Sequence, residues 1–201
     1  MIIMTFSRRR KQKTDYEQRL GLLKSGKPRI VIRRALENIR IQFIISEEKG
    51  DKTVVETTSR DLTKYGWKGH GGNLPSAYLT GYLAGLRAAK HGIKEAVVDI
   101  GLQKSVKFSA LYAAALGARD AGVHVNVGKS VTPPADRISG KHVAAFAGKL
   151  KAEPEKYRRQ FSGYLKEGLP PEDLPKHFEE VKHKITAGSG ENHAKVNREN
   201  E

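Results

Sequence analysis

The sequence predicts an α/β fold: a mixed sheet with helices on both of its faces. In the first half of the chain, apolar and polar residues alternate over short segments, which is typical of an antiparallel meander. In the second half, short apolar segments alternate with stretches of helical spacing, which is typical of strand–helix–strand units. The predicted strands cover residues 29–34, 39–45, 53–57, 95–100 and 123–127.

The chain is expected to divide into four parts. Charge and periodicity indicate a basic arm, an α/β core, a helical extension without strand signals, and a tail with one large apolar residue, Val196. We expect residues 7–13 of the arm and the tail to be disordered in the free protein, because neither segment has enough apolar surface to bury. The four parts cover residues 1–13, 14–132, 133–186 and 187–201.

Capping residues and apolar spacing set the predicted helices. Thr14 and Glu17 are spaced as a capping box with Thr14 as the N-cap, and Gly26 ends this helix. Gly81 and Gly85 lie one turn apart in a longer helix, which indicates close packing that we expect to be against the sheet. The apolar stripes of that helix and of the C-terminal helix consist of Leu79, Leu83 and Leu86, and of Leu174, Phe178, Val181 and Ile185.

Positive charge is concentrated near the start of the chain. The formal net charge is +15 at pH 7, and residues 1–34 hold eleven Lys and Arg against Asp15 and Glu17, a net +9. A clustered excess of cations is the electrostatic footprint of nucleic-acid binding. A basic helix on a membrane surface is the competing interpretation, but the run over residues 8–13 has no apolar face.

The composition argues against several functional classes. The chain contains no cysteine, which excludes disulfides, thiolate catalysis and thiol-ligated zinc. No stretch approaches the roughly 18 to 20 apolar residues that a membrane span needs, so we expect a cytosolic protein without a membrane partner. The histidines lack the spacing of two ligands on one helix face, so we predict no metal and no other cofactor.

Three regions are candidates for binding RNA. The cations of the arm can neutralise phosphates along one backbone path if the arm is extended. Arg33, Arg40 and Gln42 stand on neighbouring predicted strands, where they form either a platform for folded RNA or an ordinary solvated strand face. The Gly-rich loop over residues 64–73 contains Trp67, which either stacks on a base or plugs the edge of the sheet.

Asp99 is the residue that most suggests catalysis. It ends a strand in an Asp-x-Gly turn, which resembles the phosphate-binding hairpin of actin-like and sugar-kinase ATPases and would also suit a nuclease. A two-metal nuclease needs further acids that converge on Asp99, and the spacing of the other acids supports no such pair. A structural Asp that caps a turn is favoured, and we expect no small-molecule substrate.

A protein that compacts DNA without sequence preference is a further alternative, besides an RNA-binding protein and an enzyme that uses Asp99.

Ordered motifs along most of the chain resemble one protein family. The segment Arg8-Arg-Arg-Lys-Gln-Lys-Thr-Asp-Tyr, followed by Leu22-Leu-Lys-Ser-Gly-Lys-Pro, is similar to the opening of the L-eighteen family of large-subunit ribosomal proteins, in its archaeal and eukaryotic branch. The further matches are Tyr65–Lys68, Asn73–Gly81, Ala96–Leu102, Gly117–Gly122, Arg137–His142 and Leu174–Glu179. The connection over residues 103–107 is shorter than the family pattern, so no RNA contact is carried over to it.

The resemblance implies a function as well as a fold. It implies a ribonuclease-H-like three-layer core without nuclease activity, in which Asp99 is structural. It also implies binding to 5S rRNA and attachment of that RNA to 23S rRNA in the central protuberance, beside neighbouring ribosomal proteins. The RNA-binding residues predicted by matching position and by charge are Arg8, Arg9, Arg10, Lys11, Lys13, Tyr16, Arg19, Lys24, Lys27, Arg29, Arg33, Arg34, Arg40, Gln42, Trp67 and Lys68.

Overall fold

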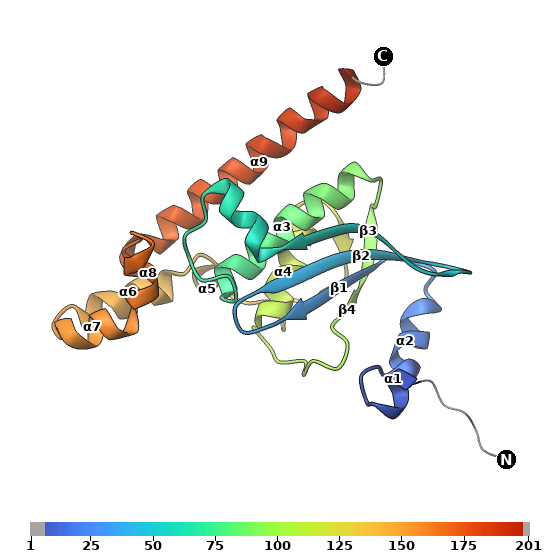
Figure 1. The fold of residues 1–201 in the computed structure, drawn as a ribbon, viewed down its shortest axis with the longest axis horizontal. Helices are drawn as coiled ribbons and strands as arrows, with labels where there is room; N and C mark the ends of the chain where they lie inside the picture. The colour runs from blue at the N-terminus through green and yellow to red at the C-terminus, as the bar shows by residue number, and fades with distance from the viewer. Residues whose placement is uncertain (1–6, 199–201) are drawn as a thin grey trace.

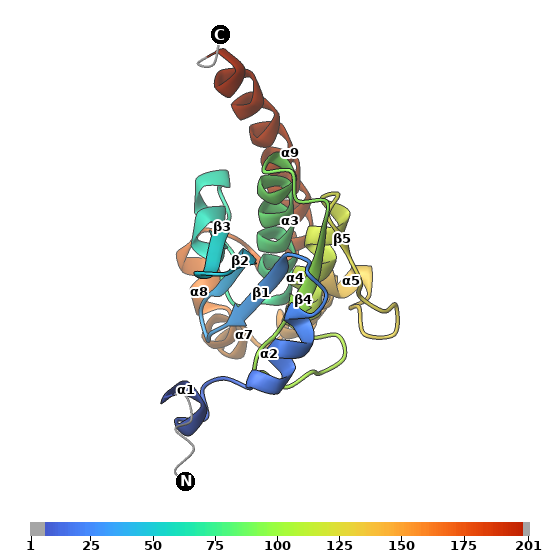
Figure 2. The same ribbon diagram turned by 90° about the vertical axis from the view of Figure 1, so that its right-hand side faces the viewer.

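One mixed sheet forms the centre of the computed structural model, which describes residues 7–198 (Figures 1 and 2). The strand order is β3-β2-β1-β4-β5. The first three strands form the predicted antiparallel meander, and β4 and β5 continue the sheet parallel to β1. The strands are β1 (Arg29–Arg34), β2 (Ile39–Glu47), β3 (Gly50–Thr58), β4 (Glu95–Asp99) and β5 (His124–Val125).

Helices lie on both faces of the sheet, as predicted (Figure 2). Two long helices, α3 and α4, cover one face and bury strand residues such as Ile30, Ile32 and Phe43. The short helix α2 lies over one end of the other face, and α9 packs against the outside of α3. The helices are α1 (Ser7–Arg10), α2 (Tyr16–Leu23), η1 (Ser59–Tyr65), α3 (Leu74–Lys90), α4 (Ala110–Asp120), α5 (Ala135–Ile138), α6 (Lys141–Leu150), α7 (Pro154–Gln160), α8 (Ser162–Lys166), η2 (Pro171–Asp173) and α9 (Leu174–Arg198).

The two glycines of α3 pack against α4, and the expected packing against the sheet is wrong. A Cβ atom on Gly81 would lie 1.9 Å from the carbonyl oxygen of Ala114, and one on Gly85 would lie 2.8 Å from that of Ala118. Gly117 of α4 completes the contact, because its Cβ would lie 2.2 Å from the carbonyl oxygen of Tyr78. The glycines therefore let the two helix backbones approach each other.

Substitution of Gly117 by alanine should destabilise the protein. The added methyl group has no space at this helix contact, so we expect the free energy of unfolding to fall by about 1 to 3 kcal/mol or more. Gly148 of α6 is the matched control, because nothing lies within 4 Å of a Cβ placed there. Gly148→Ala should raise stability by about 0.5 to 1 kcal/mol. Urea unfolding would measure both, and equal stability of the two variants would contradict the helix contact.

The start of α2 differs from the prediction by one residue. Asp15, not Thr14, is the N-cap, because its carboxylate accepts hydrogen bonds from the backbone N–H groups of Glu17 (3.0 Å) and Gln18 (3.1 Å). A carboxylate at this position also interacts favourably with the positive end of the helix dipole. The hydroxyl of Thr14 instead accepts a hydrogen bond from Nε of Arg8 (2.9 Å), which ties the arm to the start of α2.

The C-terminal helix confirms its predicted apolar stripe. Leu174, Phe178, Val181 and Ile185 are all buried and belong to the hydrophobic core. The predicted tail from residue 187 does not begin where expected, since α9 continues as a helix to Arg198. Extension of an existing helix adds a hydrogen bond for each residue and avoids the cost of nucleation.

The described part of the arm also has regular structure where disorder was expected. Residues 7–10 form the single turn α1, in which every side chain is exposed. Local backbone hydrogen bonds hold the turn, such as the one from Lys11 N–H to the carbonyl of Ser7 (3.1 Å). The rest of the predicted arm, residues 1–6, and the end of the predicted tail, residues 199–201, lie outside the described residues.

Candidate nucleic-acid interface

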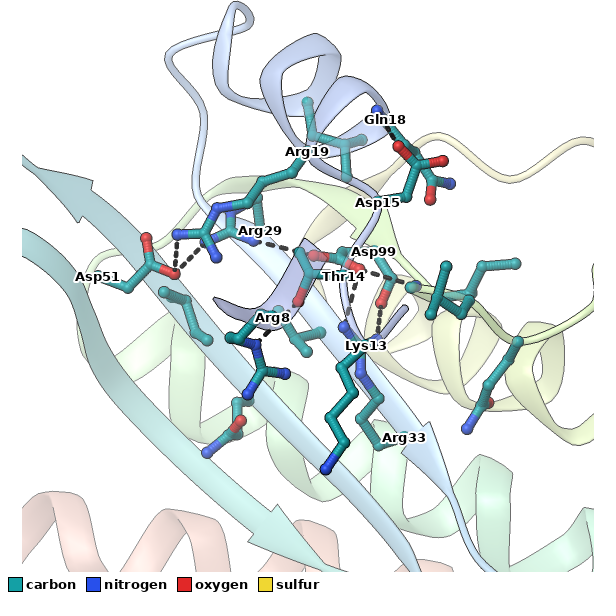
Figure 3. Close-up of a pocket in the computed structure, with 18 residues that line it drawn as sticks. Arg8, Lys13, Thr14, Asp15, Gln18, Arg19, Arg29, Arg33, Asp51 and Asp99 are labelled. Carbon is teal, nitrogen blue, oxygen red and sulfur yellow. Dashed lines mark hydrogen bonds and ion pairs between the residues drawn. The ribbon is translucent and has the colours of Figure 1, made fainter. Parts of the chain in front are cut away.

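A cleft lies between the N-terminal arm, α2 and the open face of the sheet (Figure 3). We call it the arm–sheet cleft. It brings together residues from β1 to β4 and from the first nineteen positions that are far apart in the sequence. Its polar lining residues are Arg8, Lys13, Thr14, Asp15, Gln18, Arg19, Arg29, Arg33, Gln42, Asp51, Asp99 and Gln103.

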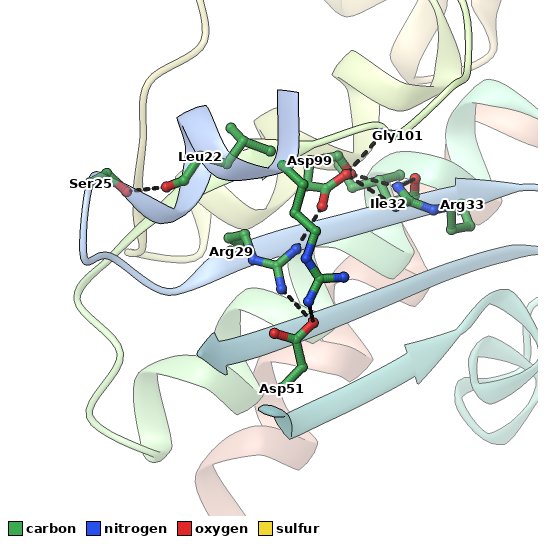
Figure 4. Close-up of polar contacts among 9 residues, drawn as sticks. Leu22, Ser25, Arg29, Ile32, Arg33, Asp51, Asp99 and Gly101 are labelled. Atoms are coloured by element: carbon green, nitrogen blue, oxygen red, sulfur yellow. Dashed lines mark hydrogen bonds and ion pairs between the residues drawn. The ribbon is translucent and has the colours of Figure 1, made fainter. Parts of the chain in front are cut away.

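Strand pairing explains why two arginines meet one carboxylate in this cleft. In the parallel pair of β1 and β4, Val31 lies opposite Asp99. Arg29 and Arg33 are two residues before and after Val31, so all three β1 residues point to the same face of the sheet. Asp99 therefore sits between two guanidinium groups on the neighbouring strand (Figure 4).

Arg29 is a buried member of this network and not an exposed RNA contact. It is only 3% exposed, because α2 lies over it. Its Nη1 lies 2.9 Å from Oδ2 of Asp99, and its Nη2 lies 2.7 Å from Oδ2 of Asp51. This burial argues against a direct contact between Arg29 and RNA. A charged group removed from water needs paired charges to remain stable, and the two carboxylates provide them.

Asp99 is fully engaged by protein groups. Its Oδ1 accepts hydrogen bonds from Nη2 of Arg33 (3.0 Å) and from the backbone N–H of Gly101 (2.8 Å), while its Oδ2 accepts from Arg29. Gly101 has a φ of 60°, and a Cβ there would lie 2.9 Å from the guanidinium carbon of Arg33. The Asp-x-Gly turn thus closes over Arg33, which supports the structural interpretation of Asp99. Within residues 7–188 no three His, Asp or Glu side chains are grouped to hold a metal ion.

Asp51 connects the network to α2. Its Oδ2 accepts a hydrogen bond from Nη2 of Arg19 (2.8 Å) as well as from Arg29. Arg19 belongs to α2, Asp51 to β3, Arg29 to β1 and Asp99 to β4, so four elements meet in one set of ion pairs. The network fixes the position of α2 over the sheet, which in turn positions the arm that precedes α2.

The polar face predicted for β1 and β2 is present. Arg33 and Arg40 lie directly opposite each other, and both line a shallow hollow together with Gln42. Two like charges in this arrangement repel each other. The repulsion is offset because Arg33 pairs with Asp99 and Nε of Arg40 lies 3.4 Å from Glu56, which also accepts a 2.7 Å hydrogen bond from Gln42.

The predicted RNA-binding residues fall into two groups. One group is engaged within the protein and fixed in place: Arg8, Arg19, Lys27, Arg29, Arg33, Arg40 and Gln42. The other group is exposed and forms no ion pair with the residues whose side chains the structure describes: Arg9, Arg10, Lys11, Lys13, Lys24, Arg34 and Lys68. Four of these seven unpaired cations, Arg9, Arg10, Lys11 and Lys13, lie on the arm. Tyr16 is half-buried at the start of α2.

Trp67 belongs to the core, which favours a packing role over stacking on a base. The side chain is only 5% exposed and stacks on the ring of His177 with centroids 5.2 Å apart. Gly69 lies directly over the indole, since a Cβ on Gly69 would be 2.5 Å from Trp67 Cζ2. The loop therefore serves to dock α9 on the core, and only Lys68 of the predicted pair remains exposed.

The buried position of Trp67 predicts a fluorescence result. Trp67 is the only tryptophan, so its emission reports this site alone. We expect the emission of the full chain to resist quenching by acrylamide and to change little when 5S rRNA is added, because no base can reach the ring. The urea-unfolded chain is the control that should be quenched readily. Strong quenching by RNA in the folded protein would show instead that Trp67 stacks on a base.

His177 makes this contact sensitive to pH. Its burial lowers the pKa of the imidazole below the usual 6.5, with Lys184 and Lys68 adding to the effect and Glu180 opposing it. The neutral ring accepts a hydrogen bond at Nε2 from the backbone N–H of Lys68 (3.1 Å). The unfolded chain then binds a proton more readily than the folded one, so the stabilisation is present above the usual pKa and is lost as the pH falls below it.

A pair of histidine variants can test this contribution. The free energy of unfolding should fall as the pH is lowered through about 6.5, and His177→Gln should make that fall shallower. His183 lies on the same helix but is exposed, so His183→Gln is the matched control and should leave the pH dependence of the parent chain. Identical pH profiles for all three proteins would contradict the assignment to His177.

Sequence reasoning missed the part played by two carboxylates. Asp99 was expected to cap a turn and no part in the cleft was expected for Asp51, whereas both carboxylates hold the arginines of the cleft. A signal was present in Arg29 and Arg33, since alternate positions of a strand face the same side and two cations there need acidic partners. The sequence did not reveal that β4 pairs with β1 in the register that supplies Asp99.

Comparisons with known proteins agree with the resemblance seen in the motifs. Residues 3–96 match a family described as ribosomal large subunit proteins 60S L5 and 50S L18. The chain is also 50% identical over 180 residues to the large ribosomal subunit protein uL18 of Methanococcus maripaludis. That alignment covers 90% of this chain and 93% of the relative. Among residues 7–198, no helix is both long enough and apolar enough to span a membrane.

Proposed function

The chain belongs to the uL18 family of large ribosomal subunit proteins, and on that premise we propose that it binds 5S rRNA across the arm–sheet cleft. As a member of this family it is a structural component of the ribosome in the cytoplasm. The observation that carries the proposal is that the arginines inside the cleft form ion pairs within the protein, whereas the cations on the arm beside it form none with the described residues. Fixed arginines build a rigid cleft, and the free cations lie on the arm and rim beside it.

This arrangement suits a folded RNA better than an extended duplex. Free Lys and Arg give affinity through phosphate contacts that do not depend on sequence. Selectivity requires shape, because the deep major groove of an A-form helix does not admit side chains. A rigid concave surface provides such shape, and the exposed cations of the arm can contact the RNA backbone beside it.

The helical extension provides a second surface for other partners. It lies on the opposite side of the molecule from the arm (Figure 1), and it exposes Phe146 (49%) and Leu165 (41%). Its exposed cations include Lys149, Arg158, Arg159 and Lys166. We place 23S rRNA and neighbouring ribosomal proteins on this surface, so that the protein attaches 5S rRNA to the rest of the subunit. The proposed function includes no catalytic role for Asp99, because both of its carboxylate oxygens form ion pairs with arginines.

Competition binding tests the proposal at the level of function. Labelled 5S rRNA bound to the full chain should be retained in the presence of excess duplex DNA and of an unrelated folded RNA. Displacement by duplex DNA would favour a non-specific DNA-compacting protein. Displacement by both competitors alike would mean that the chain binds polyanions without preference. A nuclease would instead degrade the labelled RNA when divalent metal ions are added.

A further inference from the structure

A second hollow lies beside the arm–sheet cleft, on the loop that joins β4 to α4. We call it the loop hollow. Its lining residues come from the β1–β2 turn and from that loop: Arg34, Ala35, Leu36, Gln103, Lys104, Val106, Ser109 and Leu111. This loop contains the shortened connection, so the resemblance to the family gives no contact for it.

The loop hollow exposes apolar side chains on an otherwise basic surface. Leu36 is 90% exposed and Val106 is 50% exposed, and Leu102 (59%) lies close by in the lining of the arm–sheet cleft. Clustered exposed apolar residues mark binding sites more often than single ones do. Their neighbours Arg34, Lys104 and Lys107 form no ion pair with the residues whose side chains are described, unlike the arginines inside the cleft.

The loop hollow is continuous with the arm–sheet cleft. Gln103 lines both of them. Arg34 and Ala35 line the loop hollow and also the shallow hollow that contains Arg33, Arg40 and Gln42. The three hollows therefore form one track that runs from the arm across the open sheet face to the loop. A polyanion that follows the free cations of this track passes over Leu36 and Val106.

The loop is held in place before any partner binds. The side-chain amide of Gln103 donates a hydrogen bond to the carbonyl of Arg34 (3.1 Å), and the backbone N–H of Phe108 donates one to Val131 (2.9 Å). Phe108 has a φ of 60°, a conformation that costs energy for an aromatic residue. A preformed hollow lowers the conformational entropy that the loop itself would lose on binding.

We propose that the loop hollow receives unpaired nucleotides of the bound RNA. Their bases pack on Leu36 and Val106, and their phosphates lie against Arg34 and Lys104. Paired bases do not offer their faces to side chains, whereas bases in loops and bulges do. A purely apolar protein segment would leave the surrounding cations without anions, so RNA fits the chemistry of the hollow better. The inference rests on the proposed function and adds the class of RNA element that is bound.

Two variants of the full chain separate the apolar and the ionic contributions. Leu36→Ser with Val106→Ser should weaken binding of 5S rRNA by about tenfold and leave the dependence on salt unchanged, because no charge is lost. Arg34→Gln with Lys104→Gln should weaken binding and also flatten the salt dependence by about two units. The matched control is Phe146→Ser with Leu165→Ser, which removes exposed apolar side chains from the extension and should leave 5S affinity unaltered.

Chemical modification of 5S rRNA by dimethyl sulfate would locate the contact. In the complex with the parent chain, a small set of unpaired bases should be protected, and that protection should be lost with the Leu36→Ser, Val106→Ser variant alone. Unchanged affinity and unchanged protection with this variant would overturn the inference and leave the hollow to a protein partner. A parent chain that shows no preference for 5S rRNA would instead refute the proposed function, and with it the inference.

Discussion

A chain that starts at Thr14 should bind 5S rRNA far more weakly than the full protein, with a much flatter dependence on salt. The removed segment carries Arg8, Arg9, Arg10, Lys11 and Lys13, all of them exposed. Each phosphate neutralised contributes about −0.9 to the slope of log affinity against log salt, so the slope should flatten by about four units. Binding titrations over a salt series would measure both effects.

A matched variant controls for the loss of total charge. Replacement of Lys149, Arg158, Arg159 and Lys166 by glutamine removes exposed cations of the helical extension, far from the arm–sheet cleft. This variant should keep the affinity and salt slope of the parent chain for 5S rRNA. If the truncated and the neutralised chains lose affinity equally, binding follows net charge, and the arm has no special place in the interface.

Asp99→Asn should unfold the protein more readily than any substitution at the exposed ion pairs. The change leaves Arg29 buried with only Asp51 as a charged partner. Removal of one member of a buried ion pair typically costs about 3 to 5 kcal/mol. Glu56→Gln is the control, since its pair with Arg40 is exposed and should contribute less than about 1 kcal/mol. Urea unfolding would compare the two variants.

The same substitution bears on the catalytic alternative. Asp99 positions Arg33 in the cleft, so Asp99→Asn should also lower the affinity for 5S rRNA. An enzyme centred on Asp99 predicts a different pattern, in which turnover disappears while stability changes little. Stability close to that of the parent chain would therefore contradict the role of Asp99 as a structural partner of Arg29.

Local patterns in the sequence were sufficient for the elements of the fold. The alternation over residues 39–45 predicted β2, and the apolar spacing from Leu174 to Ile185 predicted the buried stripe of α9. Packing partners were less predictable. Gly81 signalled a close approach, but only the tertiary structure shows that Ala114 of α4 is the neighbour, because periodicity does not say which element faces another.

The candidate interface was predictable in its outline and not in its interior. Clustered charge predicted the arm and the rim, whose cations are exposed. The sequence did not reveal that Arg29 is buried and left the burial of Trp67 open, because residue type alone does not determine burial. Arg29 lies beneath α2 and between two carboxylates, and Trp67 lies beneath Gly69 and against His177. Both outcomes depend on contacts between residues that are distant in the sequence.

Directed cleavage of the RNA can test whether 5S rRNA binds over the open face of the sheet. The chain has no cysteine, so a single cysteine introduced at Gln42, in the lining of the cleft, can carry an iron chelate that generates hydroxyl radicals. Lys90→Cys provides the matched probe at the exposed end of α3, the helix that covers the other face. We predict cleavage of 5S rRNA from position 42 and none from position 90. Cleavage from position 90 alone would contradict the proposed interface.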